Sequence, residues 1–102
     1  MYRTLLSAIA VIASLGIVSA AQAAGDAAAG KTKSAPCVAC HGANGQGVAP
    51  NPALAGKPAA QQVQALKDYK SGAKANPIMK GIAGGLSDQD TVDLSAYYAS
   101  LK

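Results

Sequence analysis

Both cysteines and the only histidine of the 102-residue chain stand within five consecutive positions, Cys37 to His41. Residues 36–42 read PCVACHG. Thiolates and imidazoles bind metals, and thiols also exchange disulfides or hold a cofactor covalently. The spacing C-x-x-C-H is therefore compatible with three kinds of chemical site.

Two of these sites fit the rest of the sequence poorly. A redox-active or disulfide-bonded cysteine pair suits an exported protein, but such motifs usually lie in βαβ surroundings, of which the sequence gives no sign. A structural zinc ion needs four ligands, commonly in two separated pairs, and only Asp or Met could complete the set here. The third site is covalent haem attachment, for which C-x-x-C-H is the signature. Two thiols three residues apart can bond the two vinyl groups of one porphyrin, and His41 can then bind the iron.

The composition also favours a cofactor at the centre of the protein. The chain has no Phe or Trp, and alanine makes up much of its apolar content. A domain of this size rarely gains enough stability from its apolar core alone and usually needs a disulfide, a metal or a cofactor. A large flat porphyrin would supply that core.

The N-terminus has the pattern of a secretory signal. Arg3 is followed by the apolar run 5–18 and by the small residues of AQA at 21–23, which predicts a signal peptide over 1–23 and a mature domain over 24–102. A retained anchor is the alternative, but residues 5–18 would span only about 21 Å of a hydrocarbon core about 30 Å thick. We therefore expect a periplasmic protein without a membrane span after processing. Its mature part has eight lysines and five aspartates, a net charge of +3.

Three segments have helical signals, and no strand-like alternation runs for more than a few residues. Asp26 is a plausible cap for a helix over 27–35, which Pro36 would end. A second helix is expected over 59–71, with Val63, Leu66 and Tyr69 on one face and Gly72 at its end. A third follows Ser87 and has apolar residues at 94, 97, 98 and 101. Segments 41–58 and 73–86 are expected to be loops, so the predicted fold is all-α.

The mature chain resembles a short bacterial class I cytochrome c over nearly all of residues 24–102. The resemblance rests on GDAAAGK (25–31), CVACHG (37–42), NPALAG (51–56), LKDYKSG (66–72), NPIMKGIAGGLSD (76–88) and DLSAYYASL (93–101). It implies three to four short helices wrapped around one haem c, bound covalently through Cys37 and Cys40. Residues 24–102 contain no second His, and the resemblance places Met79 as the second iron ligand opposite His41.

Other residues receive roles from the resemblance alone. It implies that the carbonyl of Pro52 accepts the other imidazole proton, although Pro50 is a close alternative, and that Leu54 lies against the porphyrin. It also implies that Gly30 lies at a close helix crossing beneath Leu94 and Tyr97. Ser34 departs from the aromatic residue that many relatives have one turn after this glycine, so we expect looser packing there. Tyr69 has two open interpretations, a contact with a haem propionate and simple core packing.

A His/Met pair fills both axial positions of the iron and raises its reduction potential. We therefore expect a monomeric electron carrier of the periplasm, not an enzyme, that exchanges electrons with respiratory or dehydrogenase partners. A haem subunit of a dehydrogenase or oxidase complex is the main alternative. A haem enzyme or sensor is disfavoured because no spare His, Arg or Glu is available for catalysis in the mature chain. We expect no nucleic-acid partner, and we expect Lys33, Lys57 and Lys80 to steer the carrier onto acidic patches of its redox partners.

Overall fold

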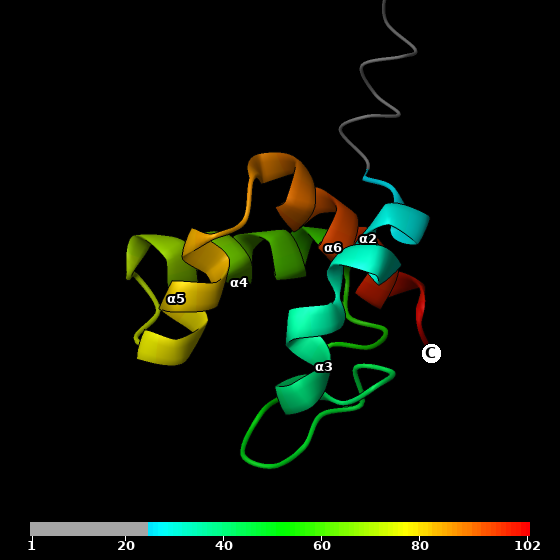
Figure 1. The fold of residues 1–102 in the computed structure, drawn as a ribbon, viewed down its shortest axis with the longest axis horizontal. Helices are drawn as coiled ribbons and strands as arrows, with labels where there is room; N and C mark the ends of the chain where they lie inside the picture. The colour runs from blue at the N-terminus through cyan, green and yellow to red at the C-terminus, as the bar shows by residue number, and fades with distance from the viewer. Residues whose placement is uncertain (1–24) are drawn as a thin grey trace, which may run out of the picture.

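The computed structural model describes residues 25–102, and the expected signal peptide lies outside them. These residues form five helices and a single isolated β-bridge between Val48 and Asn51, which confirms the all-α class (Figure 1). The helices are α2 (Ala27–Lys33), α3 (Ala35–His41), α4 (Ala59–Ser71), α5 (Pro77–Gly84) and α6 (Asp88–Ser100). Within residues 25–102, no helix is long and apolar enough to cross a membrane.

Two helices occupy segments for which the sequence predicted something else. Pro36 was expected to end a helix, but it lies in the first turn of α3, where its missing N–H is not needed and its fixed φ suits a helix. Helix α5 occupies part of 73–86, which was expected to be a loop. Asn76 begins this helix because its side chain accepts hydrogen bonds from the backbone N–H groups of Ile78 and Met79. The described residues therefore contain five helices instead of the expected three to four.

The other helix boundaries follow the sequence signals. Asp26 caps α2 by accepting from the N–H groups of Ala28 and Ala29. Ser87 and Asp90 form a reciprocal capping box at the start of α6. Gly72 ends α4 with φ +86°, a left-handed conformation that favours glycine.

Helices α2 and α6 cross closely at Gly30. A Cβ atom at this position would overlap the backbone carbonyl of Asp93 and would lie 2.7 Å from Tyr97 Cβ. The expected close crossing is therefore present, with Asp93 and Tyr97 as its nearest neighbours. Leu94 was expected there too, but it lines a cavity on another side of α6.

Polar contacts reinforce the same crossing. The Asp93 carboxylate is buried in α6 and accepts hydrogen bonds from the Asp26 backbone N–H at 2.8 Å and from Lys33 Nζ at 2.6 Å. Lys33 also pairs with Asp90 at 2.9 Å. The hydrogen bond from Lys33 lowers the pKa of Asp93. These contacts join both ends of α2 to the first half of α6.

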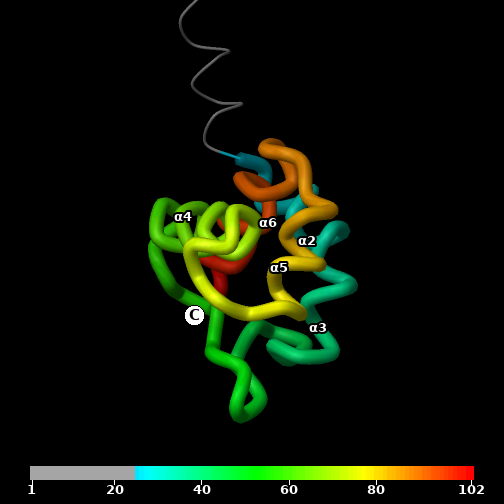
Figure 2. The backbone as a smooth tube through the Cα atoms, turned by 90° about the vertical axis from the view of Figure 1, so that its left-hand side faces the viewer, coloured from blue at the N-terminus to red at the C-terminus, as the bar shows by residue number. Residues whose placement is uncertain are grey.

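Helix α4 packs against both α5 and α6, and the chain between α3 and α4 forms a long loop (Figure 2). The loop folds back on itself because the N–H groups of Leu54 and Ala55 both donate to the Gly45 carbonyl, at 2.7 and 2.9 Å. Gly47 donates to the His41 carbonyl at 2.7 Å. The loop is thereby fixed beside the end of α3.

Candidate haem-binding site

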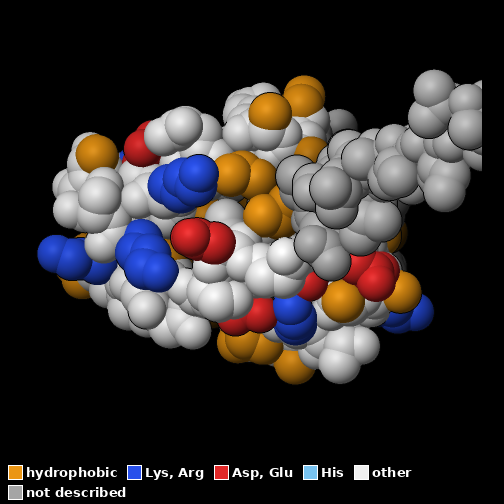
Figure 3. Space-filling view, turned by 90° about the horizontal axis from the view of Figure 1, so that it is seen from above, with side chains coloured by type: hydrophobic (Ala, Val, Ile, Leu, Met, Phe, Trp, Pro, Cys, Tyr) orange, Lys and Arg blue, Asp and Glu red, His pale blue; other side chains and the backbone are white. Residues whose placement is uncertain are grey.

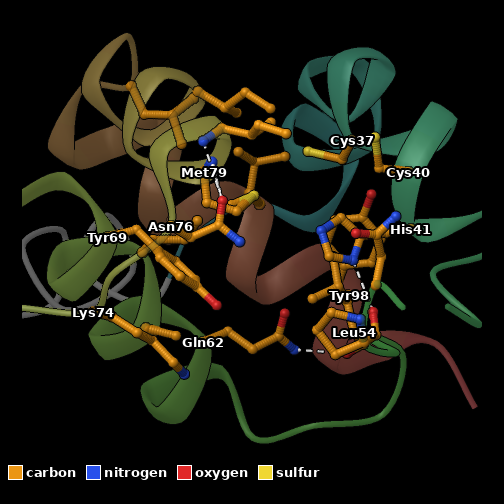
Figure 4. A pocket seen from close by; sticks show the side chains of 18 of the residues that line it. Cys37, Cys40, His41, Leu54, Gln62, Tyr69, Lys74, Asn76, Met79 and Tyr98 are labelled. Carbon is orange, nitrogen blue, oxygen red and sulfur yellow. Dashed lines mark hydrogen bonds between the residues drawn. The ribbon is translucent and has the colours of Figure 1, made fainter. Parts of the chain in front are cut away.

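One cavity of about 280 Å³ lies between α3, the 42–58 loop, α4, α5 and α6 (Figure 4). All six residues that the sequence analysis assigned to the cofactor line it: Cys37, Cys40, His41, Pro52, Leu54 and Met79. They come from three segments that are far apart in the sequence. The fold therefore brings the expected site residues together around one space.

Helix α3 gives its three chemical groups one common face. Cys37, Cys40 and His41 are three and four positions apart, a spacing that places side chains on the same side of a helix. Both cysteines are free thiols; Cys40 is exposed and Cys37 is partly buried. Burial raises the pKa of the Cys37 thiol. The structure therefore does not support a Cys37–Cys40 disulfide.

The geometry does not support a zinc site either. Within residues 25–102, no three His, Cys or acidic side chains converge closely enough to hold a metal ion. Of the three sites that the C-x-x-C-H spacing allows, covalent haem attachment is the one that this arrangement fits.

The His41 imidazole is buried and oriented by the loop. His41 is 6% exposed, and its Nδ1 atom lies 2.7 Å from the Pro52 carbonyl oxygen. A carbonyl oxygen can only accept, so Nδ1 carries a proton. In the neutral imidazole, Nε2 is then the nitrogen whose lone pair can bind a metal. The partner is Pro52, as the sequence analysis preferred, and not Pro50. A hydrogen bond from the non-ligating ring nitrogen to a carbonyl commonly fixes the tautomer of a metal-binding histidine.

Met79 enters the cavity from the first turn of α5, while His41 enters from α3 on the other side (Figure 4). The cap by Asn76 fixes the Met79 backbone, since its side-chain oxygen lies 3.0 Å from the Met79 nitrogen. Pro77 stiffens the same turn. A soft thioether and an imidazole nitrogen thus reach the cavity from two separate helices.

Gln62 has a positioning role that the sequence analysis missed. It is 7% exposed on α4, and its amide donates to the carbonyls of Leu54 at 3.0 Å and Lys57 at 2.9 Å. These bonds tie the loop segment with Pro52 and Leu54 to α4. Gln62 lies four residues before Leu66, and this spacing on the apolar face was the signal that could have identified it.

The cavity face of α4 also differs from the expected one. Of the apolar face expected from the sequence, Leu66 and Tyr69 line the cavity and Val63 does not. The other α4 residues in the lining are Gln61, Gln62 and Ala65. The Tyr69 ring lies under Lys74 Nζ, 5.2 Å from the ring centroid. Lys74 and Lys57 themselves line the cavity.

The residues around the cavity fit a haem. In the part of the chain that the structure describes, the only buried apolar residues are Ala83, Leu94 and Tyr98, so most large apolar side chains surround the cavity instead of each other. Its apolar wall includes Leu54, Leu66, Ile82, Leu86 and Leu94. An apolar chamber with two thiols on α3, and an imidazole and a thioether from two different helices, suits a covalently bound porphyrin.

Comparisons with known proteins agree with this geometry. Cytochrome c4 of Pseudomonas aeruginosa is 45% identical over 95 residues, which cover 92% of this chain and 47% of that protein. Cytochrome c-554(548) of Halomonas halodenitrificans is 47% identical over 81 residues, which cover 76% of this chain and 98% of that protein. The solved structure of reduced cytochrome c4 from Pseudomonas stutzeri has a TM-score of 0.73 at 40% identity and is matched over 78% of this chain and 47% of that chain.

The chain thus spans about half the length of the cytochrome c4 relatives that it matches. The family model for cytochrome c matches residues 27–102, which include every helix of the described structure. On this match, and on the site that these residues build, the chain belongs to the cytochrome c family.

Proposed function

We propose that the protein is a one-electron carrier whose haem is ligated axially by His41 and Met79. The observation that carries the proposal is the hydrogen bond from His41 Nδ1 to the Pro52 carbonyl. With Nδ1 bound to this carbonyl, Nε2 is the ring nitrogen that can ligate iron, in a cavity that Met79 also lines. A cytochrome c with one C-x-x-C-H segment has one haem c, attached here through Cys37 and Cys40. When bound, the haem supplies a reversible one-electron couple.

The protein's part in this function is to hold the ligands still. Pro52 fixes the tautomer of His41, Gln62 holds the loop that carries Pro52, and the Asn76 cap holds the backbone of Met79. Little rearrangement is then needed between the two oxidation states. The Met79 thioether favours ferrous iron and raises the potential. With both axial positions filled, substrates have no open position on the iron, which favours electron transfer over catalysis.

Covalent attachment and the one-electron couple can be tested on protein expressed with a haem-attachment system. After acid–acetone extraction of the denatured protein, the haem should stay with the polypeptide and no thiol should be titratable. A potentiometric titration should follow a one-electron curve. Colourless protein with a Cys37–Cys40 disulfide, or haem that extracts into the solvent, would contradict the proposal.

The lysines support docking to an acidic redox partner. Four lysines belong to α4, to α5 or to the segment between these helices. They are Lys67, Lys70, Lys74 and Lys80. On the face drawn in Figure 3, cationic side chains gather at the end of the molecule formed by these two helices. Asp68 is the acidic residue on α4, and Asp90 and Asp93 of α6 pair with Lys33 of α2.

The docking surface that we propose consists of Lys57, Lys74 and Lys80. Lys57 and Lys74 line the cavity, and Lys80 follows Met79 directly. Lys33 was expected in this surface, but it is bound to Asp90 and Asp93 on α6. We therefore leave Lys33 out.

Salt dependence tests this docking surface. Electron transfer to an acidic protein partner should slow as ionic strength rises, because charge acts mainly on the association rate. Lys57→Glu with Lys80→Glu should slow the reaction at low salt. The control, Lys31→Glu with Lys102→Glu, makes the same change in net charge away from the cavity. Equal rates for the two double variants would exclude the proposed surface.

Processing and assembly complete the proposal. We propose cleavage after Ala23, export to the periplasm and a monomeric carrier, with a permanent subunit of a dehydrogenase or oxidase complex as the alternative. The mass of the periplasmic protein would identify the first residue. Gel filtration of the native extract would separate a small free carrier from a subunit that elutes with a large complex.

A further inference from the structure

The hydroxyl group of Tyr98 is buried without a hydrogen-bond partner. Tyr98 is 3% exposed in the middle of the protein, and its hydroxyl oxygen makes no hydrogen bond within the described structure. The side chain lines the cavity that we assign to haem. Buried tyrosine hydroxyls usually have a hydrogen-bond partner, because a buried polar group without one destabilises the protein. The proton of this hydroxyl therefore still needs an acceptor in the haem-loaded protein.

The Tyr98 ring cannot easily turn away. A Cβ at Gly45 would lie only 2.7 Å from Tyr98 Cδ1, so the ring packs directly on the loop backbone at this glycine. The Tyr98 carbonyl also accepts a hydrogen bond from the Gly56 N–H at 2.9 Å. Both contacts involve the ring or the backbone, so removing the hydroxyl alone would leave them in place.

The polar side chains around the hydroxyl are those of Cys37 and Ser34. The Ser34 hydroxyl donates its only proton to the Lys31 carbonyl at 2.7 Å, so Ser34 cannot also donate to Tyr98. A large aromatic at position 34 would remove this hydroxyl and leave Cys37 as the polar neighbour of Tyr98. Ser34, which departs from the pattern of many relatives, thus keeps the surroundings of Tyr98 polar.

Haem attachment changes the hydrogen-bonding capacity of Cys37. When the Cys37 sulfur bonds to one vinyl carbon, the thiol hydrogen ends on the other carbon of that double bond. The sulfur is then a weak acceptor and no longer a donor. Tyr98 has one O–H to give. Its side chain and that of Cys37 line the same cavity and are close enough to interact.

We propose that, in the haem-loaded protein, Tyr98 donates a hydrogen bond to the thioether sulfur of Cys37 and is a positioning residue of the attachment site. The inference rests on the proposed attachment at Cys37, which the extraction experiment above decides separately. The positive end of the O–H dipole then points toward the cofactor edge. This dipole favours the reduced, more electron-rich haem. The reduction potential is therefore higher than it would be with phenylalanine at position 98.

Proton NMR of the reduced holoprotein tests the inference. We expect a slowly exchanging Tyr98 hydroxyl proton with a nuclear Overhauser contact to the Cys37 β-protons. In Tyr98→Phe this signal should be lost and the potential should fall. Tyr97→Phe is the matched control, because Tyr97 is the neighbouring tyrosine, with a ring centroid 5.0 Å away, but it does not line the cavity. It should keep both the signal and the potential.

Ser34→Ala identifies the acceptor without altering Tyr98. If the sulfur accepts, the hydroxyl signal and its contact to Cys37 persist in this variant. Loss of the signal in Ser34→Ala would assign the acceptor to Ser34 and overturn the inference. A Tyr98 hydroxyl that exchanges as fast as that of Tyr97, or an unchanged potential in Tyr98→Phe, would overturn it as well.

Discussion

The close crossing of α2 and α6 predicts a large effect of adding one methyl group at Gly30. In Gly30→Ala the new Cβ would overlap the Asp93 carbonyl and approach Tyr97 Cβ to 2.7 Å. Both neighbours are close to the backbone and cannot rotate away, so the two helices must separate. Overpacking of this kind costs typically 1–3 kcal/mol, and separation also strains the hydrogen bond from Asp26 to Asp93, worth about 1 kcal/mol. Alanine returns up to about 1 kcal/mol of helix propensity, which leaves a net loss of about 2 kcal/mol.

The assay is denaturant unfolding of the oxidised holoprotein, followed by circular dichroism in the far ultraviolet. The midpoint should fall in Gly30→Ala with an unchanged slope, which marks a change in stability and not in the unfolded state. Gly81→Ala is the control, because Gly81 is also inside a helix but a Cβ there meets nothing within 4 Å. This variant should gain up to about 1 kcal/mol. If Gly30→Ala were as stable as Gly81→Ala, the close crossing would be wrong.

Two further predictions concern the loop and the charges of α6. Gln62→Ala removes two partly buried hydrogen bonds to loop carbonyls and should lower the free energy of unfolding by about 2 kcal/mol. Gln64→Ala, at an exposed position of the same helix, should change it by less than about 0.5 kcal/mol. Equal effects would show that Gln62 does not hold the loop. Hydrogen bonds from the Ser87 backbone and from Lys33 lower the pKa of Asp90 to about 2. Because this pKa is below the unfolded value of about 3.9, the stabilisation is complete above that value and is lost as the pH falls toward 2. Unfolding midpoints measured across this range should therefore fall less steeply in Asp90→Asn, and parallel profiles would contradict the assignment.

The cofactor site was largely predictable because its chemistry is concentrated in a few residue types. Cys37, Cys40 and His41 are the only residues of their kinds, so their spacing alone indicated the cofactor. The roles of Met79 and Pro52 came from the resemblance to cytochromes c, and the structure places both beside the cavity. The hydrogen bond between Pro52 and His41 is present, and iron ligation by Met79 is a prediction.

The features that the sequence analysis missed depend on tertiary contacts. Pro36 can end one helix or begin the next, and local propensity does not distinguish these outcomes. Gln62 has a polar side chain of the kind that usually faces solvent, and the loop carbonyls that it binds explain its burial. Lys33 is close in sequence to Cys37, yet the helix directs it to α6 instead of the cavity. In each case the partner lies elsewhere in the chain.

The axial ligand pair is the central claim, and the absorption spectrum of the oxidised protein tests it most directly. The wild-type protein should show a weak near-infrared band from sulfur-to-iron charge transfer, with sharp low-spin bands on reduction. In Met79→Ala the haem should stay attached, the near-infrared band should vanish, carbon monoxide should bind readily and the potential should fall. A near-infrared band that persists in Met79→Ala, or a wild-type protein that lacks it, would contradict His41 and Met79 as the ligand pair.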